Sequence, residues 1–255
     1  MKDGGASPVL SIVIPVYNER ENIVATLQAL EETVPVPHEI FIIYDMDEDT
    51  TLEAAATIAD RWPHVRFIKN GVARGPSGAL RTGFAHARAP WVLVAMADLC
   101  DDFTQIPQLL ELAGNAQIVC PSRYCPGGQQ ELGGLKVWAP RTAGFLLKFL
   151  TGIATYDPTN SFKLYSIRLL QEIRLKSTVS FSVTLEIVAK AHVLGYTIAE
   201  VPTTWRVRKD GKTNFKLWRS LVVYMPWFGV ALLRGRFFRL PRPVLGSMFE
   251  LRPDD

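Results

Sequence analysis

The chain has 255 residues, 48% of them hydrophobic, and carries a formal net charge of +3. This length suits one α/β core with a modest appendage. A charge this small, spread over most of the chain, excludes a broad nucleic-acid-binding surface, although residues 206–242 are locally rich in Arg and Lys. Cys100, Cys120 and Cys125 form no CxxC pair, and no secretory signal precedes the first apolar run. We therefore expect reduced thiols in a cytosolic protein.

Short β-branched segments alternate with helical periods over the first hundred residues. Strands are predicted at 10–15, 39–44, 65–69 and 91–97, and helices at 21–32, 51–62 and 76–88. This alternation predicts an α/β fold, an open and mostly parallel sheet with helices on both faces. Further along the chain, helices are expected at 141–150, 167–173 and 183–194.

The segment 215–233 is aromatic and apolar and is interrupted by Pro226. Its uninterrupted apolar part, 221–233, is shorter than the roughly 20 residues that a membrane-spanning helix needs. We therefore expect a pair of amphipathic helices lying in a membrane interface, with a dimer interface or a helix packed on the core as the alternatives. The chain divides on this basis into a catalytic domain, 1–214, and an amphipathic C-terminal segment, 215–255.

Polar residues follow three of the predicted strands, where open parallel sheets bind their ligands. The turn 17–19 follows the first strand, the acidic loop 45–49 the second, and the acidic turn 98–102 the fourth. Asp98 stands directly behind an apolar strand, where a carboxylate can hold a divalent metal against the phosphates of a leaving group. The alternative is that Asp98 and Asp101 cap the next helix, with Asp101 and Asp102 in its first turn, where acids favour the helix dipole.

Four acids occur within five residues in the loop 45–49. Asp45 could contact a base or ribose, whereas Asp49 is explained by capping of the next helix. Their mutual repulsion indicates a nearby cation or donor group. Small residues around Gly75 and Ser77 open a helix, which permits a close approach to a ribose or phosphate.

Together these segments resemble the family-2 inverting glycosyltransferases of the GT-A fold, particularly the polyprenyl- and dolichyl-phosphate mannose or glucose synthases. The resemblance covers residues 11 to about 218 and rests on five segments in order: 14–22, 39–51, 119–124, 157–163 and 200–208. It implies transfer of a sugar from a nucleotide-sugar donor, with Mg²⁺ or Mn²⁺ as cofactor.

The chain departs from the family pattern at three places. Met96 occupies the position of the first acid of the family's Asp-x-Asp metal motif, which leaves Asp98 with Asp101 as a substitute ligand. Tyr44 stands where the family commonly has the first of two acids, which leaves Asp45 as the base-contacting carboxylate. The family's Ser-Gly-Phe-Arg sequence appears as residues 160–163, Asn-Ser-Phe-Lys.

The resemblance and the local chemistry assign roles to individual residues. The donor-binding residues are Pro15, Tyr17, Glu19, Asp45, Asp47, Gly75, Ser77, Ala97, Asp98 and Arg123, and the metal ligands are Asp98 and Asp101. The catalytic residues are Asp98, Arg208 and, as a base for a neutral hydroxyl acceptor, Asp157. The acceptor phosphate is assigned to Arg206, Arg208, Lys212 and Asn214, with a plain solvated charge run as the alternative.

The expected partners are a nucleotide-sugar donor, a lipid-phosphate acceptor and a membrane surface, with a homo-oligomer left open and nucleic acid excluded. With these partners, we expect a cytoplasmic protein that is peripheral on the cytoplasmic membrane face. Two rival functions remain: transfer to a soluble or saccharide hydroxyl, and a nucleotide-sugar-binding protein that has lost catalysis through the change at Met96.

Overall fold

A computed structural model describes residues 7–131, 135–206 and 217–233, the side chains of 135–140 and 217–221 excepted. Its centre is a seven-stranded sheet in the order β3-β2-β1-β4-β7-β5-β8. The strands are β1 (Leu10–Pro15), β2 (His38–Tyr44), β3 (Val65–Lys69), β4 (Trp91–Val94), β5 (Ile118–Ser122), β7 (Lys163–Ser166) and β8 (Ile198–Pro202). β7 runs antiparallel to both of its neighbours, and the other pairs are parallel. A parallel two-stranded ladder joins β6 (Gln129–Gln130) to β9 (Thr204–Trp205).

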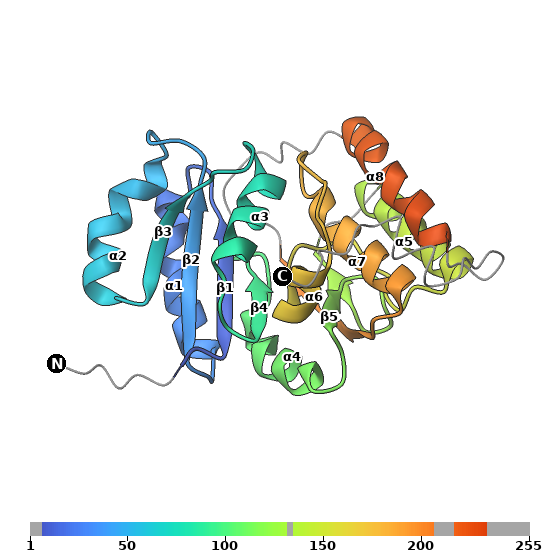
Figure 1. Cartoon of the computed structure of the whole chain (residues 1–255), viewed down its shortest axis with the longest axis horizontal. Coiled ribbons are helices and arrows are strands. Elements are labelled where there is room, and N and C mark those ends of the chain that lie inside the picture. The colour runs from blue at the N-terminus through green and yellow to red at the C-terminus, as the bar shows by residue number, and fades with distance from the viewer. Residues whose placement is uncertain (1–6, 132–134, 207–216, 234–255) are drawn as a thin grey trace.

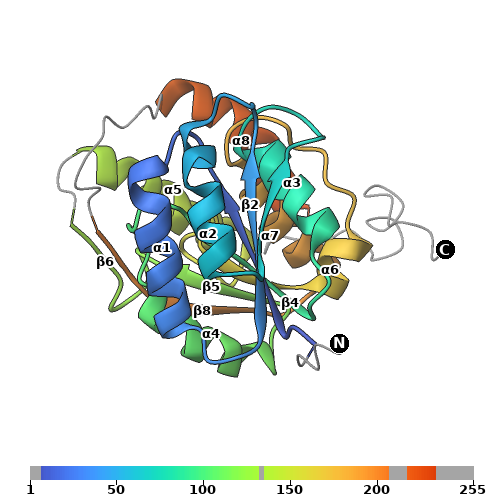
Figure 2. The ribbon, with the colours of Figure 1, turned by 90° about the vertical axis from the view of Figure 1, so that its left-hand side faces the viewer.

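Helices cover both faces of this sheet, as the sequence predicts (Figure 1). They are α1 (Arg20–Thr33), α2 (Ala55–Arg61), α3 (Pro76–His86), α4 (Ile106–Ala113), α5 (Leu135–Thr151), α6 (Ile167–Glu172), α7 (Ser182–Leu194) and α8 (Leu217–Leu232). Short 3₁₀ helices, η1 (Thr50–Ala54) and η2 (Phe103–Gln105), precede α2 and α4. Figure 2 shows α1 and α3 on opposite sides of β2.

Two apolar clusters, one on each face, explain why the strands are apolar throughout. Ile12 and Ile14 of β1 pack with α1, α2 and α4 on one face. Val13, between them, packs with α3 and the helices of the C-terminal half on the other. Alternate residues of one strand therefore enter different cores, which is the pattern of a sheet buried on both sides.

The helix expected at 141–150 is the longer α5, which begins at Leu135. Two other predicted elements also differ from the structure. The expected strand 91–97 ends at Val94, although the backbone N–H of Ala95 still donates to Val13 O at 3.1 Å. The expected helix 51–62 is a 3₁₀ turn followed by the shorter α2, because the Asp49 side chain caps the chain at Thr51. Both differences lie at the carboxyl edge of the sheet, where the chain is shaped by side-chain hydrogen bonds rather than by hydrophobic period.

The C-terminal helix α8 packs against α7 and α5, with Ala231 fully buried. Lys190 of α7 lies 5.1 Å from the centroid of the Trp227 ring. This bears out the alternative of a helix packed on the core for one face of α8. The helix pair expected over 215–233 is wrong, because α8 continues through Pro226 as one helix. The proposed boundary at 214/215 lies outside the described residues. Among the described helices, none combines the length and apolarity needed to span a bilayer.

Candidate active site

The loops after β1 and β2 are held together by one buried carboxylate. Asp49 Oδ1 accepts from the backbone N–H of Asn18 at 3.0 Å and from both the N–H and the hydroxyl of Thr51. Thr51 Oγ1 in turn accepts from the N–H of Glu19. These bonds fix the turn after Pro15, in which Asn18 has a left-handed φ of 56°. Tyr17 projects outward from this turn, and Glu19 accepts from Asn22.

Asp45 organises the loop that leads to α3. Its Oδ1 accepts from Asn70 Nδ2 and its Oδ2 from the backbone N–H of Gly75, both at 2.7 Å. Gly75 has a φ of 101°, a conformation that favours glycine at this helix start. Asp45 is thus engaged within the protein, while Asp47 at the loop surface pairs with Lys69 at 2.5 Å.

Ser77, the second residue of α3, faces the interior rather than the loop surface. It is fully buried, and its hydroxyl donates to Ser180 O at 2.6 Å and accepts from the N–H of Val183. The side chain therefore joins α3 to the start of α7. Any contact of this position with a donor would have to come from its backbone.

The acidic turn after β4 is tightly wound. Asp98 Oδ1 accepts from the N–H of Cys100 at 3.2 Å, across Leu99, whose φ is 57°. The carbonyl of Ala97 is held by the hydroxyl of Thr26 at 3.1 Å. Asp102 is the cap of η2 and accepts from Thr104, so the capping role expected for Asp98 and Asp101 belongs to Asp102. The turn thereby separates Asp102 from the pair formed by Asp98 and Asp101.

Asp101 lies close to Asp98 and turns back toward β4. Burial, together with the negative charge of Asp98, raises the pKa of Asp101 to about 7, although Arg123 and the backbone N–H of Met96 oppose the shift. Its Oδ2 is buried and has no hydrogen-bond partner among the described residues. Two neighbouring carboxylates, one with an unsatisfied oxygen, form a site that a hard divalent cation fits.

Arg123, at the end of β5, forms a buried ion pair with Asp157. Nε donates to Oδ2 at 2.6 Å and Nη2 to Oδ1 at 2.9 Å, and the backbone N–H of Arg123 also reaches Oδ2. Burial alone would raise the pKa of Asp157, but Arg123 holds it below its ordinary value. A carboxylate bound on both oxygens and kept ionised in this way is a weak general base.

The segment 157–163 carries a second buried cation. Lys163 Nζ donates to the carbonyls of Asp157 and Asn160, and Asn160 Nδ2 donates to Pro121 O. Burial lowers the pKa of Lys163, which lies close enough to Asp157 for their charges to interact. This lysine, which stands where the family has an arginine, therefore fixes the loop from inside.

The basic segment that begins at Arg206 and the helix α8 also contribute residues to this end of the sheet. The backbone N–H of Arg206 donates to Cys100 O at 3.0 Å, which brings the start of the basic segment beside the acidic turn. Arg208, Lys212 and Asn214 lie outside the described residues. Tyr224 of α8, an aromatic residue of the segment expected at a membrane interface, is instead partly buried against the core and hydrogen bonds with Ser180. Burial raises its pKa, and its bond to Ser180 and the charge of Arg123 oppose the shift.

The sequence model of the glycosyl transferase family 2 matches residues 11–174, which include the turn after β1, the acidic turn and the Arg123–Asp157 pair. This chain belongs to that family. Among curated relatives, it is 28% identical to the dolichol-phosphate mannosyltransferase of Pyrococcus furiosus over 86% of the chain and 64% of that protein. It is 30% identical to the undecaprenyl-phosphate mannosyltransferase of Micrococcus luteus over 79% of the chain and 85% of that protein. The chain thus spans less than two thirds of the Pyrococcus protein and most of the Micrococcus one.

A third relative and a solved structure agree with this placement. The polyprenol monophosphomannose synthase of Mycolicibacterium smegmatis is 27% identical over 78% of each chain. Glucosyl-3-phosphoglycerate synthase from Mycobacterium tuberculosis superimposes with a TM-score of 0.64 and 18% identity, covering 89% of this family-2 chain and 80% of its own. The structural likeness confirms the GT-A fold.

Proposed function

We propose that this family-2 glycosyltransferase moves a sugar, with inversion at the anomeric carbon, from a nucleotide-sugar donor to a polyprenyl phosphate. The observation that carries the proposal is the agreement of three relatives from three organisms, whose names all specify mannose and a polyprenyl lipid phosphate. Mannose is therefore the sugar that we propose. The Micrococcus relative, which the chain covers to 85%, gives the strongest support.

The donor side rests on the acidic turn. Asp98 and Asp101 would hold a divalent cation, Mg²⁺ or Mn²⁺, because Asp101 has a buried, unpartnered oxygen and lies close enough to Asp98 for their charges to interact. Such a cation, when bound, neutralises charge on the leaving diphosphate. The M. tuberculosis synthase was crystallised with Mn²⁺ and UDP, which supports a metal of this class. Asp101 would thus compensate for the absence of an acid at Met96.

The acceptor side favours a phosphate over a neutral hydroxyl. A phosphate oxygen is anionic at neutral pH and can attack the anomeric carbon without prior deprotonation, whereas a hydroxyl needs a base. Asp157, the carboxylate that sequence analysis names as that base, is bound on both oxygens by Arg123. Arg206 would begin the cationic segment that receives the phosphate, because its backbone lies against the acidic turn.

A membrane surface would be reached through α5 and α8, which pack side by side at one end of the molecule (Figure 1). Both helices expose large apolar side chains: Phe145, Leu146 and Phe149 on α5, and Val222, Met225 and Leu232 on α8. Apolar residues gathered on two adjacent helices suit insertion into a lipid interface. Co-sedimentation with anionic vesicles should fall markedly in Phe145→Ser/Phe149→Ser. A wild-type chain that dimerises and ignores vesicles would assign this face to a second copy instead.

The donor proposal can be tested by thermal unfolding with nucleotide sugars. Nucleoside-diphosphate mannose and glucose, each with and without Mg²⁺ or Mn²⁺, are compared in the wild type and in Asp101→Asn. A donor at 100 times its dissociation constant stabilises the native state by about 2.7 kcal/mol. We expect a metal-dependent stabilisation that Asp101→Asn removes and that the control variant Asp60→Asn, at an exposed position of α2, retains. Equal metal-dependent stabilisation in Asp101→Asn would contradict the metal assignment.

A further inference from the structure

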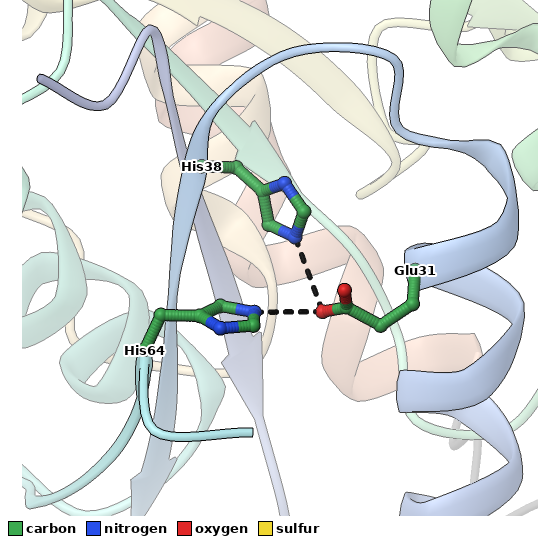
Figure 3. Close-up of side chains that lie close together, drawn as sticks. All are labelled: Glu31, His38 and His64. Atoms are coloured by element: carbon green, nitrogen blue, oxygen red, sulfur yellow. Dashed lines mark hydrogen bonds and ion pairs between the residues drawn. The ribbon is translucent and has the colours of Figure 1, made fainter. Parts of the chain in front are cut away.

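Two histidines and one glutamate meet at the opposite edge of the sheet from the acidic turn. Glu31 lies near the end of α1, His38 begins β2, and His64 precedes β3 (Figure 3). β2 is seven residues long, so the cluster lies roughly 20 Å from Asp45 at the other end of this strand. The three side chains are therefore separate from the candidate active site.

Both histidine rings point at the same carboxylate oxygen (Figure 3). Nε2 of His38 lies 3.2 Å from Glu31 Oε1, and Nε2 of His64 lies 2.7 Å from it. The rings meet edge to face with centroids 5.1 Å apart, and the ligand atoms of the three residues lie within 4.8 Å of one another. Two imidazole nitrogens and a carboxylate oxygen are the ligand set of many zinc sites.

The two ring nitrogens of His38 limit which proton or cation can lie between this ring and Glu31. Its Nδ1 lies 2.9 Å from the carbonyl oxygen of Val36, and its Nε2 faces the Glu31 carboxylate, so both ring nitrogens face acceptors. A neutral ring has one N–H and can satisfy only one of them. Either the ring carries two protons, or Nδ1–H binds the carbonyl and the Nε2 lone pair binds a cation. The second arrangement is how proteins orient a metal-binding histidine.

His64 favours the cation. If protons alone made both contacts with Glu31, each Nε2 would carry a hydrogen, and His38, whose Nδ1 also faces an acceptor, would be a charged ring beside a neutral His64. One divalent ion replaces both protons and binds both rings and the carboxylate at once. The side chains are 10%, 33% and 24% exposed for His38, His64 and Glu31, so the position is enclosed yet reachable.

We propose that Glu31, His38 and His64 form a binding site for a transition-metal ion of the Zn²⁺ class. Nitrogen ligands distinguish it from the acidic turn, whose oxygen ligands suit Mg²⁺ or Mn²⁺. His38 and His64 also line an open surface pocket with Pro8, Glu39 and Arg66, from which water would supply the fourth ligand. The bound ion joins the end of α1 to the starts of β2 and β3.

The test uses the full chain without a polyhistidine tag, freed of metal and titrated with Zn²⁺ and with Co²⁺. We expect one Zn²⁺ per chain and, at 100 times the dissociation constant, a rise in the unfolding temperature of about 5–10 °C. His64→Gln and Glu31→Gln should each lower the apparent Zn²⁺ affinity by about 100-fold or more. His86→Gln is the matched control, since His86 lies on α3 and bonds to Thr82 O. Asp98→Asn should retain Zn²⁺ binding, which separates this site from the donor metal.

Cobalt provides a readout that needs no variant. Co²⁺ in a four-coordinate nitrogen and oxygen site should give intense visible bands in the wild type. A weak octahedral spectrum, or thiolate bands from the buried cysteines, would overturn the proposal. The absence of a Zn²⁺-dependent thermal shift, or an unchanged Zn²⁺ affinity in a folded His64→Gln chain, would do the same.

Discussion

The Arg123–Asp157 pair allows a direct test of how this site is built. The change Asp157→Asn keeps the size of the side chain and removes its charge, which leaves the Arg123 guanidinium without its counter-ion. Asp157 is fully buried, and the Arg123 side chain is 16% exposed. The guanidinium donates two hydrogen bonds to Asp157 and the backbone N–H a third, so loss of this carboxylate leaves a largely buried charge without its hydrogen-bonded partner.

The expected loss of stability is large. Breaking a buried ion pair by removing one partner costs about 3–5 kcal/mol, because the remaining charge stays desolvated. Domains of this size are stable by about 5–15 kcal/mol, so the change should remove about a fifth or more of the free energy of unfolding. An exposed pair contributes about 0–1 kcal/mol. Asp47–Lys69, with side chains 70% and 51% exposed, provides that comparison in the same chain.

The assay is urea unfolding followed by circular dichroism, for the wild type, Asp157→Asn and Asp47→Asn. Asp47→Asn should stay within about 1 kcal/mol of the wild type. The double variant Arg123→Met/Asp157→Asn should recover part of the loss, because it no longer buries an unpaired charge. A loss below about 1 kcal/mol in Asp157→Asn would refute the view that this carboxylate is committed to Arg123, and would restore it as a candidate base.

Two further predictions concern stability. The pKa of Asp157 in the folded state lies below its ordinary value, so the ionised carboxylate stabilises the folded state above about pH 4, and this contribution is lost as the pH falls further. Below about pH 4, the urea midpoint of the wild type should therefore fall more steeply with pH than that of Asp157→Asn. Equal slopes below pH 4 would contradict this. A Cβ at Gly83 would lie 2.2 Å from Val13 Cγ1, so Gly83→Ala should lower the free energy of unfolding by about 1–3 kcal/mol. The second change Val13→Ala in the same chain should recover part of that loss. A Gly83→Ala chain of unchanged stability in urea would show that α3 can move away from β1.

The sequence predicts the parallel half of the sheet well, because each of its strands is a short apolar run of its own. It does not predict β7, whose first residue, Lys163, carries a charge that interrupts the apolar pattern. That strand is defined instead by antiparallel pairing with β4 and β5, which are distant in sequence. Long-range pairing of this kind leaves no local signal in a single sequence.

The site shows the same limit. The positions of Asp98 and of the loops after β1 and β2 follow from their places behind apolar strands. The turn that holds Asp98 and Asp101 contains the left-handed backbone of Leu99, and the use of Asp45 and Asp157 depends on partners 30 and 34 residues away. Whether a carboxylate is available to a ligand is therefore decided by tertiary hydrogen bonds that sequence spacing does not contain.

The most direct test of the proposed function measures the product itself. Nucleoside-diphosphate mannose with labelled sugar is incubated with polyprenyl phosphate or with the corresponding free polyprenol, and the label extracted into organic solvent is counted. We expect metal-dependent transfer to the phosphate, little to the alcohol, and a loss of at least about 100-fold in Asp98→Asn, the scale of a lost charge-stabilising contact. Equal transfer to both acceptors, or undiminished transfer by a folded Asp98→Asn chain, would contradict the account.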